Sequence, residues 1–147
     1  MTFVCWKWRS ENYRVQFTAE HVNVWARSLT RQLRGAPARL ICVTDDPTGV
    51  EIETYPLWGD HSALHNPSGK HLPSCYRRLR LFSSELQTRM GISENSPVAW
   101  SDLDVVFVDD VRPIFYDRQE PFFGWKGVGA YRDAVFNGTF VLFRAGQ

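Results

Sequence analysis

The stretch PVAWSDLDVVFVDDVRPIF, residues 97–115, decides the fold. Two apolar runs, 97–100 and 105–108, are typical of strands, and Asp102 and Asp104 lie between them. Because unpaired buried carboxylates are costly, core packing does not explain two acids at the end of a strand. Ligands of open α/β sheets bind at the carboxyl ends of strands, so the stretch predicts a ligand site there.

Strands and helices alternate around this stretch, which predicts an α/β fold with a mainly parallel sheet. We expect strands at 2–5, 39–44, 50–55, 97–100, 105–108, 121–125 and 139–143, and helices at 18–34 and 74–90. The apolar stripes expected to face the core are Val22, Trp25, Leu29 and Leu33 in the first helix and Leu79, Phe82, Leu86 and Met90 in the second. The two helices are expected to sandwich the sheet, and residues 110–115 to form a turn leading into a short helix. Residues 56–73 lack periodicity and are expected to form a long loop.

Composition limits the possible classes of protein. The chain has 147 residues, which allows one domain, and its hydrophobic fraction of 44% fits a globular core. The formal net charge of +1 lacks the basic excess of a nucleic-acid-binding protein, so no nucleic-acid partner is expected. No apolar stretch approaches the roughly 20 residues of a membrane span. Without a signal-peptide core at the start, we expect a cytoplasmic protein.

Cysteine usage agrees with a reducing compartment. The three cysteines are Cys5, Cys42 and Cys75, an odd number without metal-like spacing, so a disulfide framework is not expected. Cys5 and Cys42 lie inside apolar runs. We therefore expect both to be ordinary buried thiols.

The chemistry of the Asp pair suits a divalent cation. Two carboxylates one residue apart can hold Mg²⁺ or Mn²⁺ together, since both ions prefer hard oxygen ligands. Such an ion would neutralise a diphosphate and stabilise it as a leaving group. The alternative is a polar turn in which Asp102 and Asp104 accept hydrogen bonds from the backbone.

The same stretch resembles the strand–DxD–strand segment of GT-A glycosyltransferases, especially glycogenin-like and bacterial galactosyltransferase-like enzymes. Three more segments agree in order and rough spacing: FVCWKW (3–8) with the first strand, LICVTDD (40–46) with the second, and FNGTFVLF (136–143) with the strand near donor sugar and acceptor. The resemblance implies a single GT-A-like nucleotide-sugar-binding domain over 1–147.

The resemblance also implies roles for particular residues. Asp102 would face the ribose and the metal, and Asp104 would bind the metal directly. Arg78, or its neighbour Arg77, would contact donor phosphates or the Asp pair; the alternative for both is a solvated helix face. Asn137 would hydrogen-bond sugar hydroxyls, or else cap the backbone.

The nucleotide pocket is expected at the ends of the first two strands. By the resemblance, Trp6 and Lys7 would line it, and an aromatic ring there can stack on a base. Asp45 and Asp46 end the second strand and would belong to the same pocket. The alternative for Trp6 and Lys7 is ordinary packing at a strand end.

The chain departs from the family pattern in its metal ligands. Glycogenin-like enzymes take a third ligand from a C-terminal His motif, whereas His61, His65 and His71 all precede the Asp pair, and the chain ends at Gln147. We therefore expect most of the acceptor region to be missing. Three explanations of the missing ligand remain open: the chain is a fragment, it is a compact relative that uses another ligand, or a partner completes the site.

Three functions compete. The first is metal-assisted transfer of a sugar from a nucleotide diphospho-sugar to a glycan, protein or lipid acceptor. The second is a catalytically weak or inactive relative that binds a nucleotide or carbohydrate. The third is a phosphatase of the haloacid-dehalogenase type, in which Asp102 and Asp104 would be the two acids of the DxD motif. All the residues expected at the donor site are present, whereas most of those expected at the acceptor site are not. We therefore expect the chain to bind a nucleotide diphosphate more readily than it transfers a sugar.

Overall fold

A computed structural model gives the arrangement of these elements, and it describes residues 1–9, 15–59, 75–118, 120–126 and 137–147. In chain order the elements are β1 (Thr2–Lys7), α1 (Ala19–Leu33), β2 (Arg39–Thr44), β3 (Glu53–Pro56), the 3₁₀-helix η1 (Cys75–Phe82), α2 (Ser84–Arg89), β4 (Pro97–Ser101), α3 (Arg112–Tyr116), β5 (Phe122–Trp125) and β6 (Asn137–Arg144). None of the described helices combines the length and apolar character that a membrane crossing needs.

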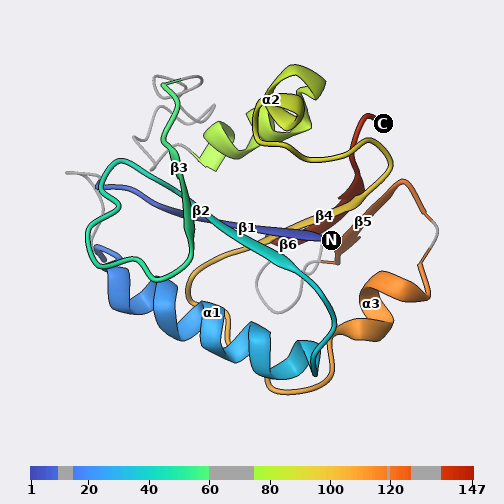
Figure 1. Cartoon of the computed structure of the whole chain (residues 1–147), viewed down its shortest axis with the longest axis horizontal. Coiled ribbons are helices and arrows are strands. Elements are labelled where there is room, and N and C mark those ends of the chain that lie inside the picture. Colours follow the sequence, from blue (N-terminus) through green and yellow to red (C-terminus); the bar gives the residue numbers. More distant parts are fainter. Residues whose placement is uncertain (10–14, 60–74, 119, 127–136) are drawn as a thin grey trace.

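The strands form one sheet in the order β3-β2-β1-β4-β6-β5 (Figure 1). The pairs β2–β3, β1–β2 and β1–β4 are parallel. β6 lies antiparallel between β4 and β5. The predicted α/β class with a mainly parallel sheet is confirmed.

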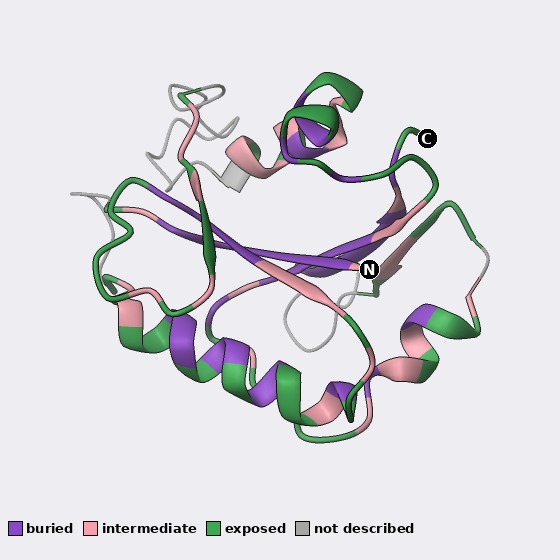
Figure 2. Cartoon of the chain, viewed as in Figure 1, coloured by how far each residue is buried: buried purple, intermediate pink, exposed green. Residues whose placement is uncertain are grey.

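Helices cover both faces of the sheet, as expected (Figure 1). Side chains of β1 alternate between the faces: Phe3 and Cys5 join the core under α1, whereas Val4 and Trp6 join the core under η1 and α2. Because both faces are covered, every residue of β1 is buried (Figure 2). Cys5 and Cys42 are both buried and free, as expected.

α1 agrees with its prediction in both position and face. Its stripe of Val22, Trp25, Leu29 and Leu33 is buried against the sheet. The helix ends at Leu33 and is capped by Arg34, which takes a left-handed conformation with φ of 48°.

The prediction of a single helix over 74–90 is wrong, because the segment forms two helices, η1 and α2. Ser83 separates η1 from α2, because its hydroxyl accepts a hydrogen bond from the Leu86 amide at 3.4 Å and caps the second helix. The buried positions shift as well. Leu81 is fully buried, whereas Leu79, which the predicted stripe placed in the core, is 48% exposed.

The strand predicted over 105–108 is also wrong: this segment has no regular secondary structure. Both sides of β4 are already occupied, by β1 and β6, so the chain that leaves β4 has no free neighbour there. It runs along α1 instead, where the Phe107 amide donates to Ser28 Oγ at 3.3 Å. Phe107 is buried there, and Val108 is 81% exposed.

β3 begins later than the predicted 50–55. The side chain of Asn23 accepts a hydrogen bond from the Glu51 amide at 3.0 Å and donates one to the Gly49 carbonyl at 2.9 Å. These bonds tie the start of the predicted strand to α1. Sheet pairing therefore starts at Glu53, opposite Ile41.

An ion pair fastens this outer strand to its neighbours. Arg39 donates to both carboxylate oxygens of Glu53, at 2.7 and 2.5 Å, and to the Met90 carbonyl at 2.5 Å. The hydrogen bonds from Arg39 lower the pKa of Glu53. The guanidinium thus joins β2, β3 and the end of α2.

We expect Glu53→Gln to destabilise the fold by at most about 1 kcal/mol at pH 7, since both partners are over a third exposed to solvent. A carboxyl whose pKa is lowered on folding stabilises the protein above its unfolded pKa of about 4.3, and this stabilisation is lost as the pH falls. The difference from the parent should therefore vanish near pH 3. Urea unfolding at both pH values measures it, with the exposed Glu94→Gln as control. An equal loss at both pH values would contradict the ion-pair explanation.

Candidate functional site

The predicted site segments meet at one edge of the sheet. β1 ends at Lys7, β2 at Thr44 and β4 at Ser101, and parallel pairing brings these ends to the same edge (Figure 1). β6 runs in the opposite direction, so its first residue, Asn137, also lies at this edge. The antiparallel strand therefore adds backbone groups to an edge formed by parallel strands.

An ion pair between Arg78 and Asp102 occupies this edge. Nη1 of Arg78 lies 2.5 Å from Oδ1 of Asp102, and the two side chains are only 15% and 27% exposed. The same nitrogen is 3.5 Å from the carbonyl oxygen of Gly138 in β6. Nε of Arg78 is buried without a hydrogen-bond partner among the described residues. Arg78 therefore joins η1 to the ends of β4 and β6.

Trp6 forms the floor beneath this ion pair. The Arg78 guanidinium carbon lies 5.5 Å from the centre of the Trp6 ring. Trp58 and Trp100 contact the same ring edge to face, with centroids at 6.4 and 5.9 Å. Trp6 is only 4% exposed. In this arrangement its ring supports Arg78. Stacking of Trp6 on a nucleotide base stays a prediction.

Arg77 lies beside this floor against a different tryptophan. Its guanidinium carbon is 5.9 Å from the centre of the half-buried Trp8 ring. Its backbone carbonyl accepts a hydrogen bond from Trp58 Nε1 at 2.7 Å. Nε of Arg77 is buried and finds no partner in the described part of the chain. The structure thus separates the two arginines: Arg78 contacts Asp102, and Arg77 contacts Trp8.

The ends of β1 and β2 carry the other predicted residues. Lys7 is buried at the end of β1. Asp45 accepts a hydrogen bond from the Arg9 amide at 3.0 Å. Asp46 accepts one from the Thr48 amide at 3.0 Å, and this bond lowers the pKa of Asp46. Asp46 therefore stabilises the turn after β2 and faces its own backbone.

Asp104 is exposed and lies on the α1 side of the turn. It lines an open hollow of about 350 Å³ together with Glu20, His21, Val24, Leu103 and Val106. Within the described ranges, no hydrogen bond or ion pair engages its carboxylate. Among the described residues Asp104 thus has no partner, whereas one oxygen of Asp102 is paired with Arg78. Asp102 is not among the residues that line the hollow.

Hydrogen bonds from α1 and β6 fix the turn that carries both acids. Trp25 Nε1 donates to Ser101 Oγ at 2.7 Å in the core, directly before Asp102. The Asp102 amide donates to the Thr139 carbonyl at 2.9 Å. The Val105 amide closes the turn on the Asp102 carbonyl at 3.3 Å. The turn is therefore held by its surroundings before any ligand binds.

The donor set fits a hard divalent cation only in part. Among the described residues, the Asp104 carboxylate and Oδ2 of Asp102 have no partner, and carboxylate oxygens suit Mg²⁺ or Mn²⁺. Among the residues that the structure describes, no three His, Cys, Asp or Glu side chains cluster as a metal site. His61, His65 and His71 lie outside the described residues. Two carboxylates need further oxygen ligands, which a diphosphate can supply.

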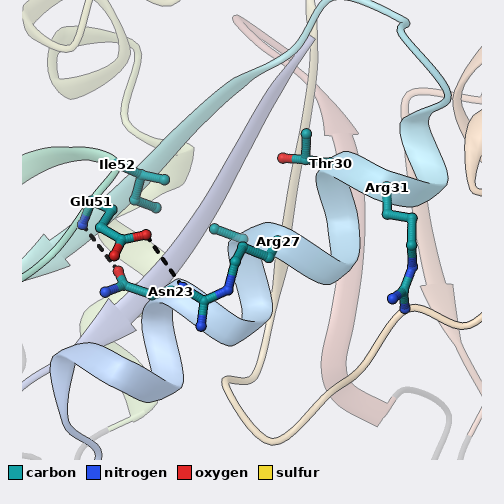
Figure 3. A pocket seen from close by; sticks show the side chains of 7 residues that line it. Asn23, Arg27, Thr30, Arg31, Glu51 and Ile52 are labelled. Carbon is teal, nitrogen blue, oxygen red and sulfur yellow. Dashed lines mark hydrogen bonds and ion pairs between the residues drawn. The ribbon is translucent and has the colours of Figure 1, made fainter.

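A second hollow lies between α1 and residues 51–52 (Figure 3). Figure 3 shows Asn23 bonded to the Glu51 amide and Arg27 paired with the Glu51 carboxylate, at 3.3 Å. These bonds hold the segment that precedes β3 against the helix. We assign the hollow a structural role.

The sequence did not identify the aromatic support of the site. Trp58 lies in the predicted loop, and Trp100 was counted only as part of a strand. Trp100 Nε1 donates to the Gly138 carbonyl at 3.2 Å, so the same oxygen meets both Trp100 and Arg78. The tryptophan content of the chain, six residues, was the available signal, but it does not say which rings meet.

Solved structures match this architecture. A galactosyltransferase, LgtC, solved in complex with donor and acceptor sugar analogues, superposes with a TM-score of 0.65 at 16% identity, over 98% of this chain and 58% of its own. The chain has a GT-A-like fold. An active-site mutant of LgtC gives a TM-score of 0.57 at 20% identity, and the match covers 98% of this chain and 57% of the mutant chain.

This GT-A-like chain thus spans a little under three fifths of the LgtC chain. Neither a protein-family model nor a curated protein sequence matches it. The predicted GT-A-like fold is confirmed by these structures. Membership of the glycogenin-like family stays a prediction.

Proposed function

We propose that the chain is a glycosyltransferase that takes a sugar from a nucleotide diphospho-sugar and passes it to a glycan, protein or lipid acceptor. The observation that carries the proposal is the Arg78–Asp102 ion pair directly after β4, at the carboxyl edge of a GT-A-like sheet. A half-buried cation next to an acidic side chain suits a ligand that has both phosphates and a metal ion. LgtC, which has this fold, was solved with donor and acceptor sugar analogues.

Different side chains of the chain would bind different parts of the leaving group, which is the nucleotide diphosphate. Arg78 donates to phosphate oxygens, and Asp104 and Oδ2 of Asp102 hold Mn²⁺ or Mg²⁺. When bound, the ion supplies Lewis-acid stabilisation of the departing diphosphate. Trp6 keeps the Arg78 guanidinium in place beneath the ligand. Asn137, at the start of β6, is proposed to contact the sugar.

A weakly catalytic or non-catalytic nucleotide-binding protein is the second candidate. It is favoured by one observation: the described residues contain no three-ligand metal cluster. A poorly ligated ion stabilises the leaving diphosphate less, while base and ribose contacts can persist. We therefore propose that residues 1–147 bind a nucleotide diphosphate more readily than they transfer a sugar.

Paired measurements on one preparation test these proposals. Calorimetry with uridine diphosphate (UDP), with and without Mn²⁺, reports binding, and a donor-hydrolysis assay reports turnover. Metal-assisted, saturable binding with slow turnover is the expected result. Brisk turnover would show that an unidentified ligand completes the site. No binding of any nucleotide diphosphate to the folded protein would refute the transferase proposal, and capture of phosphate on Asp102 would indicate a phosphatase.

We expect Arg78→Met to weaken metal-assisted UDP binding by about 10- to 100-fold, because a hydrogen bond to a charged group contributes about 1.5–3 kcal/mol. Arg78→Lys should recover part of this loss, since the charge remains but the planar donor group does not. Arg89→Met is the matched control, because Arg89 is exposed on α2. Equal affinity of Arg78→Met and parent in calorimetry would remove Arg78 from the site.

A further inference from the structure

Two thiols lie side by side in the core beneath α1, apart from the edge that carries the site. Cys5 of β1 and Cys42 of β2 are direct partners in the parallel register of the two strands. Both are 0% exposed and belong to the core that includes Val22 and Trp25 of α1. The structure therefore pairs two nucleophilic groups that the proposed function does not use.

The spacing of the strands permits a bond between these thiols. Neighbouring strands lie about 4.8 Å apart, and disulfides join residues whose Cα atoms are about 4.4–6.8 Å apart. Register partners in a parallel pair point to the same face of the sheet, and both thiols lie in the same core cluster. A modest adjustment of the side chains is then enough to bring the sulfur atoms together.

The two thiols also differ in character. A hydrogen bond from Cys5 lowers the pKa of Cys42, and burial raises the pKa of Cys5. Cys42 is therefore the better nucleophile of the two, and Cys5 is the thiol held beside it. A buried thiol alone is inert, but this one has a resolving partner in register.

We propose that Cys5 and Cys42 form a redox-active pair that hydrogen peroxide converts into a disulfide linking β1 to β2. The Cys42 thiolate attacks one peroxide oxygen, the O–O bond breaks, and the leaving hydroxide takes a proton and departs as water. The Cys5 sulfur then attacks the Cys42 sulfenic acid, the S–O bond breaks, and a second water leaves. The two thiols together supply the two electrons that reduce the peroxide.

The test uses the folded chain with Cys75→Ser, so that only the pair remains. After exposure to hydrogen peroxide, the protein is denatured in N-ethylmaleimide and mapped by mass spectrometry. We expect both thiols to be lost together, a cross-linked peptide that contains Cys5 and Cys42, and full recovery with dithiothreitol. Circular dichroism should show that the oxidised protein keeps its fold. Should this variant fail to fold, the same mapping is done on the parent chain.

Single-thiol variants provide the matched controls. Cys5→Ser should stop at a Cys42 sulfenic acid that dimedone traps, and Cys42→Ser should leave Cys5 open to alkylation. Three results would overturn the proposal. These are retention of both thiols under peroxide that oxidises the urea-unfolded chain, conversion only to sulfinic or sulfonic acids, and cross-links only between molecules.

Discussion

Replacing Asp104 by Asn should abolish the metal-dependent part of UDP binding, with a loss of at least about 100-fold in affinity when Mn²⁺ is present. Within the described part of the chain the Asp104 carboxylate has no partner, whereas one oxygen of Asp102 already pairs with Arg78. An amide keeps the shape of the side chain but loses the charge that a hard cation requires. Calorimetry with and without Mn²⁺ measures the difference.

Asp109→Asn is the matched control for this variant. Asp109 is an exposed carboxylate five positions further along, paired with Arg34 at 3.6 Å. Its replacement should leave UDP binding unchanged at every metal concentration. Should Asp104→Asn bind UDP as the parent does in Mn²⁺, the assignment of the metal to this turn would be wrong.

Trp25→Phe should cost about 2–4 kcal/mol of unfolding free energy, measured by urea denaturation. The smaller ring leaves a cavity in the core, and Ser101 Oγ loses the indole donor at 2.7 Å. Because Ser101 directly precedes Asp102, the variant should also weaken metal-assisted UDP binding. Ligand affinity and stability should therefore fall together.

Trp125→Phe offers a surface comparison. Trp125 is 38% exposed and stacks on Phe140 with ring centroids 4.9 Å apart. Its loss should cost under about 1 kcal/mol and leave UDP affinity as it was. Comparable losses of stability in the two variants would mean that burial and the Ser101 bond do not distinguish Trp25.

Apolar patterning was enough to predict much of the sheet. β2 was predicted at 39–44 and is observed over the same residues, because a run of β-branched residues between turn residues strongly favours a strand. The α1 stripe was predicted for a similar reason. Both are local patterns whose partners only need to be apolar.

The errors arise where tertiary contacts override such patterns. Residues 105–108 have strand propensity, but β4 has no free edge and Ser28 holds the Phe107 amide. Ser83 interrupts an apolar stripe of helical period by capping a new helix. Neither the filled edge nor the competing cap is visible in local sequence.

The sequence predicted the acids of the site but not the aromatic side chains that support Arg78. Asp102 stands out at the end of an apolar run, because charge there needs a reason. The contact of Arg78 with Asp102 and Trp6 joins segments far apart in sequence, and no periodic pattern encodes it. The roles of these residues in binding stay predictions.

The antiparallel position of β6 has a consequence for the order of folding during synthesis. A chain that emerges from the ribosome as far as β4 has already made β1, β2 and α1, which can pack early. The Asp102 amide and the Trp100 indole must then wait for the carbonyls of Thr139 and Gly138. A nascent chain stalled before residue 137 should thus hold a partly formed sheet that still lacks the contacts of β6 at the proposed nucleotide site.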